Sequence, residues 1–433
     1  MTPDDGRRPG GSDFDTVDFF TDEALVPDPY PYFDHLRAKC PVTPATAFNV
    51  LAVTGYEAAL SVYKNPAFSS INSVAGPFSG MPITPGESDD VSDLIEQHGA
   101  NVPMAEHITS QDPPLHTRTR SLMNTLITPK RLKENEDFMW RLADQQLDTF
   151  LAKGECEFLA DYAKPFSLLV IADLLGVPPA DHEDFKAVFA NETVGELGKD
   201  APTSSHNPLE WLNERFYRYL DERRRAPRED VLTGLALAKY EDGSTPDLAD
   251  VVNLSTFLFA AGSETTTKLV SSAVRFIGDN PGFEEMLRAD RSKIPAFCEE
   301  TLRMESPVKA HFRLARTSTT IGEVAVPAGT TVMLLPGACN RDPKKFEDPY
   351  EFRADRPNVR EHIAFIRGAH SCPGAPLARA EGRISLNRIL DRMTDITISE
   401  AHHGPADNRR YTYEPTFIMR GLSDLHITFK EIS

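Results

Sequence analysis

The stretch Phe365-Ile-Arg-Gly-Ala-His-Ser-Cys372-Pro-Gly-Ala-Pro-Leu-Ala-Arg379 predicts a loop that leads into a helix, with a single cysteine at the junction. Gly368 and Gly374 lie on either side of Cys372 and permit backbone conformations that a side chain would disfavour. Apolar residues recur at helical spacing over residues 377–392, so Cys372 precedes a helix N-terminus. Free N–H groups at such an end stabilise a thiolate, which could serve as a nucleophile or as a metal ligand. A buried structural cysteine is the remaining alternative.

The fixed positions of this stretch, Phe-x-x-Gly-x-His-x-Cys-x-Gly-x-x-Leu-Ala-Arg, resemble the haem-ligand loop of the cytochrome P450 family. The resemblance implies that Cys372 is the axial ligand of the iron of haem b. It further implies that Phe365, His370 and Gly374 help to bind this cofactor. The fold that it implies is mainly α-helical with small β-sheets (α+β), a single large helical domain that encloses the haem.

The overall composition describes an acidic chain of 433 residues with a formal net charge of −19 and 26% charged residues. This charge argues against nucleic acid or an anionic membrane surface as the main partner. The longest apolar run, residues 166–177, is interrupted by Asp173 and is too short to span a bilayer, so we expect no membrane anchor. The five cysteines lack metal-type spacing and are odd in number, which indicates a reducing cytoplasm without a disulfide framework.

The order of patterns along the chain predicts one domain, residues 16–433, after a flexible tail at residues 1–15. Gly, Pro, Ser and Asp dominate residues 72–114, and a loop of this length in a compact protein favours a substrate-access lid. Periodicity predicts helices at residues 56–64, 90–97, 115–126, 129–152, 162–175, 182–189, 209–225, 230–240, 247–279 and 292–304. Alternation predicts strands at 319–326 and 330–335 and a hairpin within 411–430.

The long helix at 247–279 contains Ala261-Gly-Ser-Glu-Thr-Thr266, in which glycine and threonine lower the helix propensity. Thr265 can donate a hydrogen bond to a preceding carbonyl and bend the helix. The plain alternative is a tolerated kink with an exposed Glu264. The resemblance implies an oxygen-activation segment in which Ala261 and Gly262 lie against the haem and Gly262 opens a groove for dioxygen. Thr265 would hydrogen-bond dioxygen and Glu264 would supply protons, since proton delivery needs a positioned acid and alcohol.

Glu300 and Arg303 lie three residues apart on a predicted helix, where such a pair is usually a weak surface contact. Their context, Glu-Thr-Leu-Arg, resembles the Glu-x-x-Arg helix of the family. Arg356, in Phe352-Arg-Ala-Asp-Arg356-Pro, matches the arginine that completes a buried triad with them. The resemblance implies a structural role behind the haem.

The haem propionates need paired cationic donors, and the resemblance implies four residues for this role. His116 and Arg120 are four residues apart and project from one helix face. Arg313 and His370 complete the predicted set, because buried carboxylates require hydrogen-bonding cations. Taken singly, each of these residue types is more often a surface charge, and only the four together favour the role at the propionates.

The substrate pocket that the resemblance implies combines one helix with two distant segments. Lys309 and His311 are unusual polar members, and we hypothesise that they meet a carboxylate or hydroxyl group of the substrate. The alternatives are that they point outward or help to hold a propionate. Loss of Lys309 should weaken binding of an acidic ligand if the hypothesis holds. The full predicted lining is Phe257, Ala260, Ala261, Val308, Lys309, His311, Ile418 and Met419.

Ile366 departs from the family pattern, which usually has glycine directly after the phenylalanine of the loop. A β-branched residue adopts a positive φ only at a considerable cost. We therefore expect the backbone of the loop to be rearranged locally at this position.

Pro373 follows the ligand cysteine and has no N–H group, so one potential hydrogen bond to the sulfur is lost. Fewer such bonds leave a more electron-donating thiolate and a lower haem reduction potential. We expect Pro373→Leu to raise the potential, measured by spectroelectrochemical titration. An unchanged or lower potential in the variant would contradict this explanation.

Arg367, Arg379, Arg383 and Arg388 surround the cysteine loop and its helix, which predicts a docking surface for an acidic electron-transfer protein. Solvated arginines that serve no partner are the alternative. The resemblance as a whole implies a cytoplasmic, monomeric monooxygenase that receives electrons from NAD(P)H through a ferredoxin and its reductase. It would use O2 to hydroxylate a small lipophilic substrate such as a terpenoid, steroid, fatty acid, aromatic compound or secondary metabolite.

Three other activities remain compatible with parts of the sequence. A haem-thiolate peroxygenase would not need both Glu264 and Thr265. A hydrolase with Cys372 as nucleophile would need a histidine base placed by the fold. A non-catalytic haem sensor or carrier would tolerate Thr265→Ala without loss of function.

Overall fold

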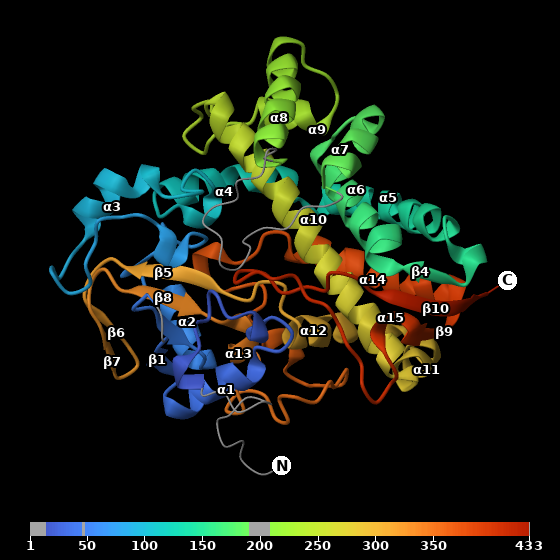
Figure 1. Ribbon diagram of the computed structural model, residues 1–433. Coiled ribbons are helices and arrows are strands. Elements are labelled where there is room, and N and C mark those ends of the chain that lie inside the picture. The colour runs from blue at the N-terminus through green and yellow to red at the C-terminus, as the bar shows by residue number, and fades with distance from the viewer. Residues whose placement is uncertain (1–13, 46–47, 190–207, 433) are drawn as a thin grey trace.

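The computed structural model describes residues 14–45, 48–189 and 208–432. Helices dominate these residues and surround one long central helix, α10 (Figure 1). The helices are α1 (Tyr30–Lys39), α2 (Tyr56–Lys64), α3 (Ser92–His98), α4 (Leu115–Leu126), α5 (Pro129–Asp148), α6 (Lys164–Leu175), α7 (His182–Phe189), α8 (Pro208–Arg225), α9 (Val231–Ala236), α10 (Leu248–Asp279), α11 (Pro281–Ala289), α12 (Ile294–Met304), α13 (Pro336–Cys339), α14 (Ala375–Arg392) and α15 (Glu400–His403).

The strands form small sheets that lie at two sides of the helical body (Figure 1). The largest sheet has the order β1-β2-β8-β5-β3, in which only β2 and β8 run parallel. A second sheet has the order β4-β10-β9, and β6 and β7 form a hairpin. The strands are β1 (Val42–Pro44), β2 (Leu51–Val53), β3 (Phe68–Ser69), β4 (Glu155–Glu157), β5 (His311–Ala315), β6 (Thr319–Ile321), β7 (Val324–Val326), β8 (Thr331–Leu334), β9 (Met393–Ile398) and β10 (His426–Glu431).

Helix α10 crosses the centre of the molecule and packs against α6, α8, α12 and α14 (Figure 1). Its neighbour α6 is apolar on all sides and almost entirely buried, as expected for a helix inside the core. Gly176 ends α6 in a left-handed conformation with φ of +79°, a common way for a helix to terminate. The main hydrophobic core surrounds α10 and includes residues of α5, α6, α8, α12 and α14.

The expected fold class is confirmed, and helices predicted at 115–126 and 182–189 begin and end where the structure has them. The strongly periodic helix at 247–279 is α10 with one residue less. The expected hairpin within 411–430 is confirmed in part: Tyr413 and Leu422 form an isolated antiparallel bridge, whereas β10 begins only at His426 and pairs with β9 and β4. Strands β5 and β9 and helix α11 were not anticipated from the sequence pattern.

Candidate functional site

The cysteine loop has an unusual backbone at Ile366, whose φ is +58°. The expectation that this residue would force a local rearrangement is wrong, because isoleucine here adopts the left-handed conformation itself. Such a conformation costs on the order of 1–3 kcal/mol and persists only where the surroundings impose it. Hydrogen bonds from Ile366 N–H to the Ile363 carbonyl and from Cys372 N–H to the Phe365 carbonyl, both 2.9 Å, hold the turn.

Gly368 allows this loop to lie directly against α2. Its φ is +77°, and a Cβ there would come within 2.6 Å of the Tyr63 carbonyl oxygen. A short 3₁₀ helix, Gly368–His370, follows and leads to Cys372. The position of the loop is therefore fixed by a contact with the N-terminal part of the chain.

The Cys372 sulfur lies just before α14, as predicted, and the backbone N–H groups of Gly374 and Ala375 hydrogen-bond to it. Burial raises the pKa of the Cys372 thiol, while these N–H groups and the Arg120 and Arg379 guanidinium groups act in the opposite direction. The side chain is nevertheless accessible to solvent, unlike buried Cys156, Cys298 and Cys339. A residue that is surrounded by protein and yet accessible borders an internal space, as an axial ligand must.

One face of α10 also borders an internal space. Among the residues around the predicted oxygen-activation segment, half-buried positions recur three or four residues apart: Phe257, Ala260, Ala261, Glu264 and Thr265. This spacing places them on one stripe of the helix. The other residues of the helix between Leu254 and Leu269 are buried, apart from half-buried Gly262. The stripe is thus the side of α10 that protein does not cover.

Thr265 Oγ1 donates to the Ala261 carbonyl at 2.8 Å, the local hydrogen bond that the sequence suggested. Gly262 has a different explanation from the predicted dioxygen groove. A Cβ on Gly262 would lie 3.0 Å from two carbon atoms of Ile171 on α6, so the glycine permits the close packing of two helices. The groove for dioxygen at Gly262 remains a prediction.

A buried contact connects α10 to the helix that follows the cysteine. Thr266, the neighbour of Thr265, donates to Glu381 on α14 at 2.9 Å. Glu381 is 1% exposed, and burial raises the pKa of its carboxyl well above the usual value. The contact holds the oxygen-activation segment at a fixed position relative to α14.

The four predicted propionate ligands come together from distant segments. The rings of His116 and His370 lie 4.0 Å apart, and Arg120 donates to the Ser371 carbonyl at 2.8 Å. Burial lowers the pKa of His370 to about 2, with the charges of Arg313, His116 and Arg120 adding to the effect. His311 lies near the same group, because the charges of Arg313 and His370 help to lower its pKa.

The two arginines of this group lack anionic partners among the described residues, and burial keeps the histidines beside them neutral. Arg313 is 4% exposed, and among the described residues its guanidinium donates to the Ser73 hydroxyl and the Phe312 carbonyl alone. Neither Arg120 nor Arg313 forms an ion pair within the described part of the chain, although buried charges normally require one. Both ring nitrogens of buried His311 are also without a hydrogen-bond partner there. A ligand with two carboxylates beside Cys372 would satisfy these groups, and haem b has this chemistry.

The predicted triad is assembled in the interior. Arg303 donates two hydrogen bonds to Glu300, at 2.7 and 2.8 Å, and Arg356 donates to Glu300 at 3.1 Å. All three side chains are at most 1% exposed. The remaining donors of Arg303 bind the carbonyls of Asn340, Pro349 and Glu351, so the triad joins α12 to the segment before the cysteine loop.

The predicted substrate-pocket residues divide into two groups. Val308 and Met419 form an isolated β-bridge, and the half-buried Ile418 adjoins it, so the two distant segments do meet. Lys309 lies elsewhere: its ammonium donates to the Thr416 carbonyl and lies 5.5 Å from the Phe19 ring. Burial lowers the pKa of Lys309 to about 7. The Thr416 carbonyl and the Phe19 ring therefore account for the ammonium of Lys309 in this structure, and the hypothesis that Lys309 meets the substrate remains a prediction.

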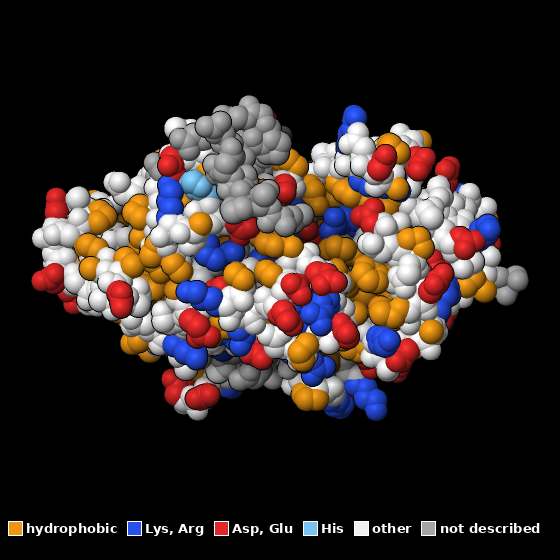
Figure 2. All heavy atoms as spheres, turned by 90° about the horizontal axis from the view of Figure 1, so that it is seen from below, with side chains coloured by type: hydrophobic (Ala, Val, Ile, Leu, Met, Phe, Trp, Pro, Cys, Tyr) orange, Lys and Arg blue, Asp and Glu red, His pale blue; other side chains and the backbone are white. Residues whose placement is uncertain are grey.

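The expected basic surface is largely neutralised by acidic partners. Arg379 pairs with Glu299 at 2.5 Å, Arg383 pairs with Glu136, and Arg388 pairs with Asp144 and Asp391. On the face seen in Figure 2, positive and negative side chains are likewise interspersed. Among the four predicted arginines only Arg367 has no ion pair within the described residues. The prediction of an arginine patch is therefore wrong for three of its four members.

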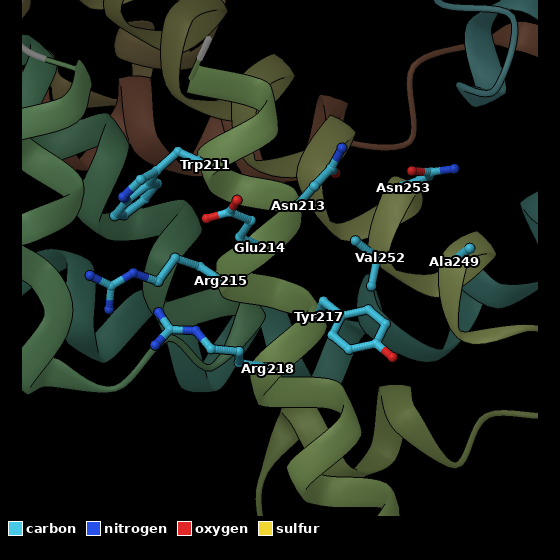
Figure 3. Close-up of a pocket in the computed structure, with 9 residues that line it drawn as sticks. All are labelled: Trp211, Asn213, Glu214, Arg215, Tyr217, Arg218, Ala249, Val252 and Asn253. Atoms are coloured by element: carbon cyan, nitrogen blue, oxygen red, sulfur yellow. The ribbon is translucent and has the colours of Figure 1, made fainter. Parts of the chain in front are cut away.

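A cavity of about 760 Å³ lies between α8 and the first turns of α10 (Figure 3). Trp211 and Tyr217 on α8 and Val252 and Asn253 on α10 are among the residues that line it. It contains none of the predicted pocket residues. Asn253 precedes Gly262 by nine residues, or about 13 Å along the helix.

Two charged residues near the site were missed by sequence reasoning. Lys268 and Glu381 are both almost fully buried, on α10 and α14. A sequence signal existed, since each is a charged residue at the helical spacing of its apolar neighbours. Such a position is normally filled by a charge only when it has a buried partner.

Comparisons with known proteins agree with this arrangement. The family model described as Cytochrome P450 matches residues 188–409. "Cytochrome P450 144" of Mycobacterium tuberculosis is 33% identical over 89% of this chain and 87% of its own length. Cytochrome P450 monooxygenase PikC of Streptomyces venezuelae is 30% identical over 93% and 91%, respectively. The structure of Mycobacterium marinum cytochrome P450 CYP150A6 in the substrate-free form is 57% identical, with a TM-score of 0.91 over 97% of this chain and 100% of that chain.

Proposed function

This chain belongs to the cytochrome P450 family and is a haem-thiolate monooxygenase, and from this premise we propose that it hydroxylates a C–H bond of a small lipophilic molecule. The overall reaction combines the substrate, O2, two electrons and two protons to give the alcohol and water. The observation that carries the site assignment is the meeting of Arg120 and Arg313 with His116 and His370 beside Cys372, where neither arginine has an ion-pair partner within the described residues.

Cys372 would hold the haem iron, and the N–H groups of Gly374 and Ala375 would orient its sulfur. Arg120 and Arg313, with His116 and His370, would bind the propionates. When bound, the haem supplies dioxygen activation, which its cysteine ligand assists by favouring O–O cleavage. Phe365 and the backbone of Ala261 and Gly262 would enclose the cofactor.

Thr265 and Glu264 would deliver protons at the uncovered stripe of α10. The Thr265 hydroxyl donates to Ala261 and leaves its oxygen lone pairs free to accept a proton donor. Glu264 is 26% exposed and can exchange protons with solvent. An acid that reaches water next to an alcohol that faces the reaction space is a suitable proton relay.

The substrate would lie against Phe257 and Ala260 of α10 and against Val308, Ile418 and Met419. These side chains are apolar, which supports a lipophilic substrate. Residues 72–114 would act as the access lid of a single domain, although they are tied down at one edge by the Asp90–Thr317 bridge and the hydrogen bond from Val91 N–H to the Arg316 carbonyl. His311, with its unpartnered ring nitrogens, remains a candidate to bind a propionate.

The decisive test is the absorption spectrum of the dithionite-reduced protein with carbon monoxide. A strongly red-shifted Soret band is expected, because only thiolate ligation produces it. A haem band without that shift would mean that Cys372 is not the thiolate ligand. Absence of any haem band would mean that Cys372 is a nucleophile or a structural cysteine and not a haem ligand. The spin-state shift of the haem would then be measured on addition of a steroid, a fatty acid and a terpene. The compound that produces the shift indicates the substrate class.

We also place the protein in the cytoplasm as a monomer that takes electrons from a ferredoxin and its reductase. Its five cysteines are unpaired, which suits a reducing compartment. No helix within the described ranges has both the length and the apolarity to cross a membrane. A cavity of about 470 Å³ between α5, α12 and α14 contains Lys133 and Arg360, which form no ion pair among the described residues. These cations, with Arg367, would contact an acidic ferredoxin.

Lys133→Glu with Arg360→Glu should slow reduction by an acidic ferredoxin by about tenfold or more, because charge complementarity governs the association rate. Stopped-flow reduction under carbon monoxide measures this rate at several salt concentrations. Reduction by dithionite should be unchanged. Lys239→Glu, an exposed lysine after α9, is the matched control. An unchanged rate in the double variant would show that this surface does not contact the ferredoxin.

A further inference from the structure

Lys268 is a buried cation one helical turn after Glu264, and it lies between two carboxylates. Its Nζ is 3.0 Å from Glu264 Oε1 and 2.6 Å from Glu414 Oε2, while its side chain is 3% exposed. Burial alone would lower the pKa of Lys268, but the two carboxylates together raise it above the ordinary value. Lys268 is therefore charged, and in the interior such a charge requires a partner at all times.

The C-terminal loop is shaped to receive this lysine. Gly421 lies against the Lys268 side chain, and a Cβ on Gly421 would come within 2.5–2.9 Å of Lys268 Cγ, Cδ and Cε. Glu414 is held in the same loop, because its N–H donates to the Gly421 carbonyl at 3.0 Å. Gly421 leaves room for the Lys268 side chain and Glu414 pairs with its ammonium, so the loop forms a specific binding site for this lysine.

The two carboxylates bind Lys268 in different ways. Glu414 forms a hydrogen bond with the ammonium at 2.6 Å. Glu264 Oε1 forms an ion pair with the ammonium at 3.0 Å and has no other hydrogen-bond partner among the described residues. Glu264 is the more distant of the two partners, and it is the one that precedes Thr265 in the chain.

We propose that Lys268 is a positioning residue for proton delivery: it holds Glu264 in an ion pair, and Glu414 allows Glu264 to leave that pair. The inference rests on the proposed function, in which Glu264 is the acid that serves Thr265. In the structure Glu264 is paired with Lys268 and the Thr265 hydroxyl is bonded to Ala261, so transfer requires Glu264 to leave Lys268. Glu414 makes that departure possible, because the buried ammonium keeps one anionic partner when Glu264 turns toward Thr265.

The test is a double-mutant cycle on the haem-loaded full chain with electrons from NAD(P)H through a ferredoxin and reductase. It needs no substrate, since oxygen is then reduced to peroxide (O2 + 2 e⁻ + 2 H⁺) or further to water. The readouts are peroxide released per NAD(P)H consumed and the solvent deuterium isotope effect on consumption. Glu414→Gln should raise the peroxide fraction by about three- to tenfold, the size of a coupling between neighbouring charged groups. The isotope effect should rise with it, because Glu264 is then the sole anion on Lys268.

In the Lys268→Met background, Glu414→Gln should have no further effect, because no buried ammonium remains to retain Glu264. A wild-type peroxide fraction in Glu414→Gln, or an effect that persists in the Lys268→Met background, would overturn the proposal. The carbon monoxide spectrum checks that each variant binds haem. Asp395→Asn, which removes the acidic partner of exposed Lys430 at 2.8 Å, is the matched control. A wild-type result in Glu264→Gln would instead show that Glu264 is not the acid, which is a failure of the proposed function itself.

Discussion

Replacing Cys372 by serine should abolish the red-shifted Soret band and lower oxygenase turnover by about a thousandfold or more, as for loss of an essential catalytic group. The serine hydroxyl can still accept the N–H groups of Gly374 and Ala375, so the loop should keep its shape. It cannot donate electron density as a thiolate does, because an alcohol is not ionised at neutral pH. The loss is thus one of chemistry and not of folding.

Cys40→Ser is the control for this variant, since Cys40 is a partly exposed free cysteine at the end of α1. Its spectrum and turnover should match those of the unaltered protein. The measurements are the carbon monoxide spectrum, product formation and the urea midpoint of unfolding. A red-shifted band that survives in Cys372→Ser would refute the assignment of the thiolate ligand.

Arg303→Met should be the most destabilising of the substitutions considered, by about 3–5 kcal/mol, because it leaves the Glu300 carboxylate buried with one partner fewer. Three backbone carbonyls that Arg303 binds, those of Asn340, Pro349 and Glu351, lose their donor as well. We expect a lower urea midpoint and reduced haem retention at a given temperature, measured by fluorescence and by absorbance.

The control is Arg225→Met, which removes the ion pair of Arg225 with Asp221 at 2.6 Å on the surface of α8. Arg225 is 78% exposed, and an exposed pair of this kind contributes about 0–1 kcal/mol. Equal destabilisation by the two variants would mean that the buried triad has no special structural role.

The sequence was most informative where a pattern depends on nearby residues. The long periodic run of α10 and the motif around Cys372 needed only local spacing, and the Thr265 hydrogen bond to Ala261 followed from the type of residue. Strands β5 and β9 could not be located in this way, because their partners lie far away in the chain: β5 pairs with β3 and β8, and β9 pairs with β10.

The incorrect expectations share a cause, which is that tertiary contacts decide where a charged or strained residue points. Three arginines that read as a basic patch are paired with Glu299, Glu136 and Asp144 from other helices. No spacing rule gives these partners, since each comes from a segment remote in sequence.

The seat of the cysteine loop on α2 has a consequence for the maturation of the enzyme. Ile366 adopts its left-handed conformation and Gly368 touches Tyr63 only after segments some 300 residues apart have met. During synthesis the N-terminal half leaves the ribosome first but cannot complete its sheet, because β2 pairs with β8 and β3 pairs with β5. Haem capture then reports that chain assembly is complete, so cofactor content in cell extracts should serve as a direct assay of correct folding.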